Sequence, residues 1–135
     1  MNVPKPLHGL VCSNITIVVG SFVKKNQLGW IFSNDSGVIT EREPDSVRGP
    51  DVAFCSYKRL PKRSRPKREY LGVAPELVFE VLSADDRWSK LQSKVTEYLD
   101  AEVLVVCVVD PKDEFVIVYT PDAARVNLGA MMCSS

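Results

Sequence analysis

Residues 77–82, with the sequence "LVFEVL", constrain the fold of this chain more than any other segment. Five of the six are apolar, and the exception is Glu80 in the middle. A strand that is apolar on both faces is typical of a sheet covered on each side by other elements. The run "VLVVCVVD" at 103–110 has the same character. The chain is therefore expected to form a sheet between two layers, with a carboxylate inside it.

The remaining apolar patterns predict helices on either side of that sheet. Helical spacing is found over 8–26 and at about 87–99, where Ser83 and Asp86 are candidates to cap the second helix. Strands are expected at 30–32, 38–40, 52–55, 77–82, 103–110 and 115–120. Because a helix separates the strands at 77–82 and 103–110, these two should pair in parallel. The prediction is a mixed α/β sandwich.

Composition indicates how many domains the chain forms and in which compartment it is found. The length of 135 residues suits one domain, and 17 basic and 17 acidic residues cancel. We expect no signal peptide and no membrane span, which would need about 18 or more apolar residues in a row. The cysteines lie far apart without a CxxC pair, which argues against a disulfide framework or a zinc site: Cys12, Cys55, Cys107 and Cys133. These features favour a cytoplasmic protein.

One loop carries a concentrated positive charge. Two prolines, Pro61 and Pro66, argue that it is exposed and not helical. Such a loop could bind nucleic-acid phosphates, or it could be a solvated loop without a ligand. Its seven cations within eleven residues are Lys58, Arg59, Lys62, Arg63, Arg65, Lys67 and Arg68.

Glu80 needs a partner, because an unpaired buried carboxylate is costly. Asp51 begins an apolar strand in "RGPDVAF", and Lys94 lies beside the apolar face of the helix at 87–99. Two carboxylates can hold magnesium or manganese, and a nearby ammonium can orient water or stabilise developing negative charge. The alternatives are a turn role for Asp51, an internal ion pair for Glu80 and a solvated surface position for Lys94.

Three blocks resemble a known family. The segments "VRGPDVAF", "APELVFEVLSADDRWSKLQSKVTEYL" and "LVVCVVDPKDEFVIVY" are similar, in order, to the Uma-two family of restriction-endonuclease-like proteins. That family belongs to the PD-(D/E)XK nuclease superfamily. The resemblance implies an αβββαβ core with a central mixed sheet flanked by helices. It further implies a DNA endonuclease that uses Mg²⁺ or Mn²⁺ and forms a homodimer.

The resemblance also assigns residues. Asp51 matches the PD aspartate and Glu80 the acid of the following motif, so both would bind the metal. Leu82 stands where the parent motif has lysine, and the resemblance points to Lys94 as its replacement. His8 matches a histidine common at the start of the family's first helix and is a possible accessory residue. For Asp35 we expect a role in a turn.

The chain departs from the family at both ends. Members carry an extra N-terminal strand with an acidic residue, as well as closing strands, whereas this sequence begins "MNVPKPLHG" and ends "NLGAMMCSS". We therefore expect one nuclease-like domain over 1–135, shortened at both ends, with sheet edges open to pairing.

Three functions remain open from the sequence. The first is a metal-dependent endonuclease with Asp51, Glu80 and Lys94 as catalytic residues. The second is an inactive module of the same fold that binds nucleic acid or protein. The third is a dimeric structural domain with Glu80 and Lys94 as an internal salt bridge. A nucleotide-driven enzyme is disfavoured, because no GxxxxGK[ST] or GxGxxG motif is present.

Overall fold

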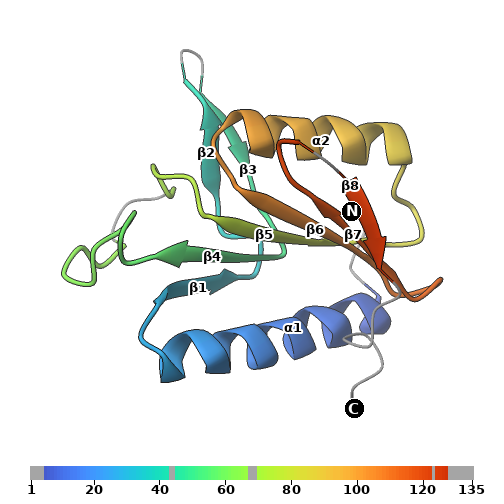
Figure 1. The fold of residues 1–135 in the computed structure, drawn as a ribbon. Coiled ribbons are helices and arrows are strands. Elements are labelled where there is room, and N and C mark those ends of the chain that lie inside the picture. The colour runs from blue at the N-terminus through green and yellow to red at the C-terminus, as the bar shows by residue number, and fades with distance from the viewer. Residues whose placement is uncertain (1–4, 43–44, 67–69, 123, 128–135) are drawn as a thin grey trace.

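A central sheet lies between two helices (Figure 1). The computed structural model describes residues 5–42, 45–66, 70–122 and 124–127. The sheet has six strands in the order β1-β4-β5-β6-β7-β8, and β2 and β3 pair separately. The elements are α1 (Pro6–Lys25), β1 (Gly29–Ser33), β2 (Val38–Glu41), β3 (Ser46–Arg48), β4 (Val52–Ser56), β5 (Leu77–Val81), α2 (Trp88–Asp100), β6 (Val105–Asp110), β7 (Phe115–Tyr119) and β8 (Ala124–Asn127).

The predicted fold class is confirmed. β5 and β6 pair in parallel across the α2 crossover, while the other neighbouring strands of the sheet are antiparallel. The sheet is therefore mixed, with α1 on one face and α2 on the other. Two strands were not predicted, β3 and β8, because each is short and carries no clear apolar alternation. The strand expected at 38–40 exists as β2, but it pairs with β3 and not within the central sheet.

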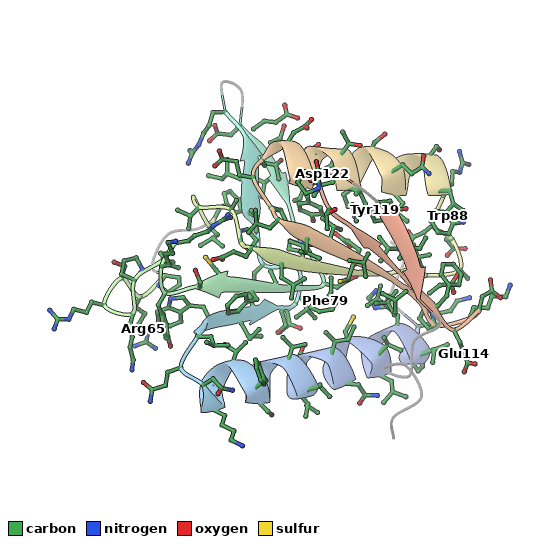
Figure 2. The ribbon with its side chains drawn as sticks, in the orientation of Figure 1. Arg65, Phe79, Trp88, Glu114, Tyr119 and Asp122 are labelled. Carbon is green, nitrogen blue, oxygen red and sulfur yellow. The ribbon has the colours of Figure 1, made fainter. Side chains whose placement is uncertain are left out.

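Strand β5 divides its side chains between two apolar clusters. Val78 packs with Leu91, Val95 and Tyr98 in the cluster beneath α2. Phe79 and Val81 pack in the other cluster, beneath α1, with Val11 and Ile15 of that helix. The alternation of side chains along a strand therefore directs Glu80 to the α2 side, together with Val78. Figure 2 shows Phe79 on the α1 side of the sheet.

The expected caps of the second helix are wrong. α2 begins at Trp88, its N-cap residue is Arg87, and no side chain caps it. The carboxylate of Asp86 instead accepts a hydrogen bond of 2.7 Å from the backbone N–H of Ser83, within the turn before the helix. Because the Asp86 carboxylate accepts this hydrogen bond within the turn, it does not cap the helix.

Helix α1 is apolar on more than the face that packs on the sheet. By length and composition it could cross a membrane, which the sequence expectation of no span had not included. Val11, Ile15 and Val23 are buried within the protein, while Leu10, Ile17 and Phe22 are exposed. α1 therefore serves as a core helix in this fold and still presents apolar side chains to its surroundings.

Candidate nuclease site

Glu80 is the buried charged residue of the described chain, and it has two partners on α2. The hydroxyl of Tyr98 donates a hydrogen bond of 2.8 Å to its Oε1, and Nζ of Lys94 lies 3.7 Å from the same oxygen. Burial raises the pKa of Glu80 to about 7, although Lys94 and the Tyr98 hydroxyl act in the opposite direction. The site therefore holds a carboxyl group that can ionise near neutral pH.

The helical spacing explains how Lys94 and Tyr98 reach the same carboxylate. They are four residues apart on α2, so they lie one above the other on one face of the helix. Tyr98 is fully buried, whereas the side chain of Lys94 is 35% exposed and connects the buried acid to solvent. The sequence prediction that Lys94 could reach a carboxylate is confirmed as geometry. Its catalytic role stays a prediction.

Asp51 lies next to Glu80 across two antiparallel strands. Asp51 directly precedes β4, and the first residue of that strand, Val52, pairs with Phe79, the neighbour of Glu80 in β5. The backbone N–H of Val81 donates a hydrogen bond of 2.7 Å to Oδ2 of Asp51. Burial raises the pKa of Asp51, and the Asp51 charge in turn raises that of Glu80. Asp51 is thus part of the same electrostatic site.

His8 and Asp35 also reach Asp51. Nε2 of His8, in the first turns of α1, lies 3.5 Å from Oδ2 of Asp51. Asp35 lies in the turn after β1, as expected, with a positive φ of 55°. Its carboxyl group also raises the pKa of Asp51. From the sequence we had preferred a turn role for Asp35 over a place at the site; the turn role is confirmed, and Asp35 also acts on Asp51.

Gly49 allows the turn of Asp35 to approach. A Cβ atom at this position would lie 2.5 Å from the backbone oxygen of Asp35 and 3.0 Å from its Cβ. Real side chains do not tolerate such a contact with backbone. The absence of a side chain two residues before Asp51 therefore brings the second carboxyl group close to the first.

A cavity of about 800 Å³ opens on Glu80 from the side of α2. Arg87 and Lys90 line it beside Lys94, and both are exposed. Arg48 also lines it, but its guanidinium is bound by Glu97 through hydrogen bonds of 2.8 and 2.9 Å. The sequence reasoning missed Arg87 and Lys90. Their positions seven and four residues before Lys94, on the same face of the helix, were the available signal.

The basic loop lies at the other end of β4 from Asp51. Asp51 precedes this five-residue strand and the loop follows it, so about 17 Å separates them at ~3.3 Å per residue. Figure 2 shows Arg65 projecting beyond that end of the sheet. Arg59 differs from its neighbours, because its guanidinium donates to the carbonyls of Ala74 and Glu102. Lys67 and Arg68 lie outside the described residues.

The donor set fits a hard divalent cation. Asp51, directly before β4, and Glu80, in β5, offer carboxylate oxygens, and the charge of Asp51 raises the pKa of Glu80. Magnesium and manganese prefer oxygen ligands of this kind. The observation that supports such an ion is that burial raises the pKa of both carboxyl groups and the Asp51 charge raises that of Glu80 further, which one cation would relieve.

Fold and site together define a restriction-endonuclease-like protein, with one acid before β4, a second inside β5 and a lysine on α2. The model of the Uma2 family, described as "Putative restriction endonuclease", matches residues 1–129, and the chain belongs to that family.

Comparison with solved structures agrees on the fold. The chain is similar to the crystal structure of a putative nuclease belonging to DUF820 from Anabaena variabilis ATCC 29413, with a TM-score of 0.81 and 22% identity. The match covers 95% of this chain and 70% of that one. No curated protein matches significantly. The family supports a nuclease function of a general kind, whereas the solved structure shows the fold alone.

Proposed function

We propose that this protein is a metal-dependent endonuclease that hydrolyses phosphodiester bonds in DNA. The observation that carries the proposal is the placement of Glu80, which has a side-chain exposure of 7% and lies near enough to Asp51 for that charge to raise its pKa. A protein that needed Glu80 for packing alone would do better with an apolar side chain, because a buried ion pair is seldom stabilising overall. Two such acids at one end of a sheet favour a catalytic purpose.

Each residue of the site has a distinct task under this proposal. Asp51 and Glu80 would hold Mg²⁺ or Mn²⁺, and the bound ion would supply positive charge for the scissile phosphate and lower the pKa of a water. The Val81 N–H fixes the orientation of Asp51, and the Tyr98 hydroxyl fixes that of Glu80. The Lys94 ammonium, held 3.7 Å from Glu80, orients the water or stabilises the negative charge that develops on the phosphate. His8 restrains Asp51 from the side of α1.

The cations near the cavity supply the contacts to DNA. Arg87 and Lys90 lie on the approach to Glu80 and can bind phosphates that flank the scissile bond. The basic loop, about 17 Å away at ~3.3 Å per residue of β4, can bind the same duplex at a distance of several base pairs. Both contacts are independent of base sequence and should be sensitive to salt.

The test combines metal binding with cleavage on the same preparations. Calorimetric titration of Mn²⁺ into the wild type should show binding that Asp51→Asn and Glu80→Gln each abolish. Supercoiled plasmid with Mg²⁺ or Mn²⁺ should be nicked by the wild type and by Lys112→Ala, a control at an exposed lysine in the β6–β7 turn. Lys94→Ala should fold and bind metal but lose nicking by about 100-fold or more.

The alternative is an inactive domain of the same fold, and the same experiment separates the two. A wild type that is folded, binds no Mn²⁺ and leaves plasmid intact would overturn the nuclease proposal. Glu80 would then be an internal partner of Lys94 and Tyr98. Nicking that survives in both carboxylate variants would overturn it as well, because a contaminating nuclease would explain the activity.

A homodimer remains a proposal, and the exposed apolar side chains of α1 support it. Leu10, Ile17 and Phe22 are each more than half exposed, and a second copy of the chain would bury them. Sedimentation velocity should give a dimer for the wild type and a monomer for Ile17→Asp. A wild type that sediments as a monomer at all concentrations would contradict this.

A further inference from the structure

A second group of ligand-type side chains lies against Asp51 on the side of α1. His8 and Cys12 are four residues apart on the helix, so both project from the same face. Nδ1 of His8 lies 3.7 Å from Sγ of Cys12, and Nε2 of His8 lies 3.5 Å from Oδ2 of Asp51. One ligand atom from each of the three residues can be chosen so that all lie within 4.8 Å of one another.

The chemistry of this group differs from that of the acid pair. A thiol, an imidazole and one carboxylate are poor ligands for magnesium, which prefers oxygen. They suit Zn²⁺ or Co²⁺, which bind sulfur at about 2.3 Å and nitrogen at about 2.0–2.1 Å. Tetrahedral ligands at those lengths lie roughly 3.5 Å apart. With one nitrogen of His8 in the set, the three ligand atoms lie within 4.8 Å of one another, so small rotations of the side chains would bring them to that spacing.

An ion can reach the three side chains from solvent, and they supply three of the four ligands that a tetrahedral ion takes. A cavity of about 450 Å³ opens on all three residues, and Asp35 and Thr16 line it as well. His8, Cys12 and Asp51 are each partly exposed, so an ion can enter without unfolding the helix. Three protein ligands leave a fourth position for water or for Asp35, whereas closed structural sites supply four.

We propose that His8, Cys12 and Asp51 form a binding site for a thiophilic divalent cation such as Zn²⁺. The sequence argument against zinc considered cysteine pairs alone, and the fold instead joins one cysteine to a histidine on the same helix and to an aspartate of another element. Because Asp51 is shared, Zn²⁺ here competes with Mg²⁺ at the acid pair and inhibits cleavage. This last consequence rests on the proposed nuclease function; the binding site does not.

Cobalt replaces zinc in the test, because a Co²⁺–thiolate bond gives a charge-transfer band in the near ultraviolet. Cys133 lies outside the described residues, so all proteins carry Cys133→Ser. Co²⁺ should produce the band in this background and in Cys107→Ala, a control at a buried thiol of β6. Cys12→Ser should abolish the band and weaken Zn²⁺ binding by about 100-fold or more, since even loss of a partner of a metal ligand costs ~10–100-fold.

Two further variants separate this site from the proposed catalytic site. His8→Gln should weaken Zn²⁺ binding and shift the band, whereas Glu80→Gln should retain the band while it loses Mn²⁺ binding. A band that is absent from the background protein, or unchanged in Cys12→Ser, would overturn the proposal. A band that persists while no protein nicks plasmid would uphold the thiophilic site and reject the nuclease alone.

Discussion

The hydroxyl of Tyr98 donates a hydrogen bond to the carboxylate of Glu80, and both side chains are buried between α2 and the sheet. This bond ties the orientation of the acid to the packing of the helix. Tyr98 otherwise belongs to the apolar cluster of Val78, Leu91 and Val95. Tyr98 therefore belongs both to the core and to the candidate active site. A substitution that disturbs its packing should also change the orientation of the Glu80 carboxylate.

Replacement of Tyr98 by phenylalanine tests that link. Tyr98→Phe keeps the ring in the core but removes the donor, so we expect a loss of about 1–3 kcal/mol in the free energy of unfolding. The pKa of Glu80 should rise further, because this hydrogen bond lowers it. Urea unfolding checks the stability. Tyr119→Phe on β7, which removes a half-buried hydroxyl, is the matched control and should cost less.

Glu80 should make the protein less stable as pH rises. Its pKa in the folded state is about 7, above the ordinary value of 4.5, so the folded protein binds this proton more tightly than the unfolded chain. The free energy of unfolding should fall between pH ~4.5 and ~7, by up to about 3 kcal/mol. Glu80→Gln stays neutral, so in the absence of divalent cations it should be the more stable protein at pH 8.

Urea unfolding of both proteins in a chelator, from pH 4 to pH 8, measures this difference. At pH 4 the two should be nearly equal, because Glu80 is protonated in both states. If the difference in the free energy of unfolding between the two proteins does not grow with pH, then ionisation of Glu80 does not destabilise the fold. Its pKa would then not be raised by burial.

The pair of Arg48 and Glu97 should hold the β2–β3 hairpin against α2. Glu97 accepts two hydrogen bonds from Arg48 of β3 and one from Thr40 of β2. Because the Arg48 side chain is 41% exposed, we expect a coupling energy of only about 1 kcal/mol. A double-mutant cycle of Arg48→Ala and Glu97→Ala measures it. Arg48 lowers the pKa of Glu97, so the coupling should be present at neutral pH and vanish as pH falls through that pKa.

Two clusters of cations should contribute differently to DNA binding and cleavage. Arg87→Gln with Lys90→Gln removes two cations beside the cavity, and Arg63→Gln with Arg65→Gln removes two from the basic loop. Each pair should reduce the slope of log K against log salt by about 2, since each phosphate contact contributes ~0.9. Only the first pair should also slow single-turnover cleavage. If both pairs slow cleavage equally, the basic loop acts nearer to Asp51 and Glu80 than the length of β4 indicates.

Gly49 should tolerate no side chain. Gly49→Ala would place a Cβ atom 2.5 Å from the backbone oxygen of Asp35, so we expect destabilisation of about 1–3 kcal/mol. Gly9→Ala is the matched control, because its Cβ meets no atom within 4 Å on α1 and alanine favours a helix by ~1 kcal/mol. Thermal unfolding should therefore move in opposite directions for the two variants. A neutral Gly49→Ala would show that the turn of Asp35 can shift freely.

Patterns in the sequence were enough to predict a sheet between two layers of helix and much of the site around Glu80. Apolar runs on both sides of Glu80 required a covered strand, and helical periodicity placed Lys94 on the same face of α2 as the core residues. Local patterns report such features because period and burial are properties of a few neighbouring residues. Asp51 could be joined to Glu80 because it begins one apolar strand while Glu80 interrupts another, and the resemblance made both metal ligands, a role that stays a prediction.

Only the tertiary structure shows which side chains that are distant in the sequence lie beside Asp51. His8 and Cys12 share a face of α1, but no spacing in the sequence relates that helix face, or Asp35 in the turn after β1, to Asp51. The separate pairing of β2 with β3, and the distance of the basic loop from the acids, were equally invisible. Contacts of this kind depend on how whole elements pack, and packing is set by the complete core and not by any one segment.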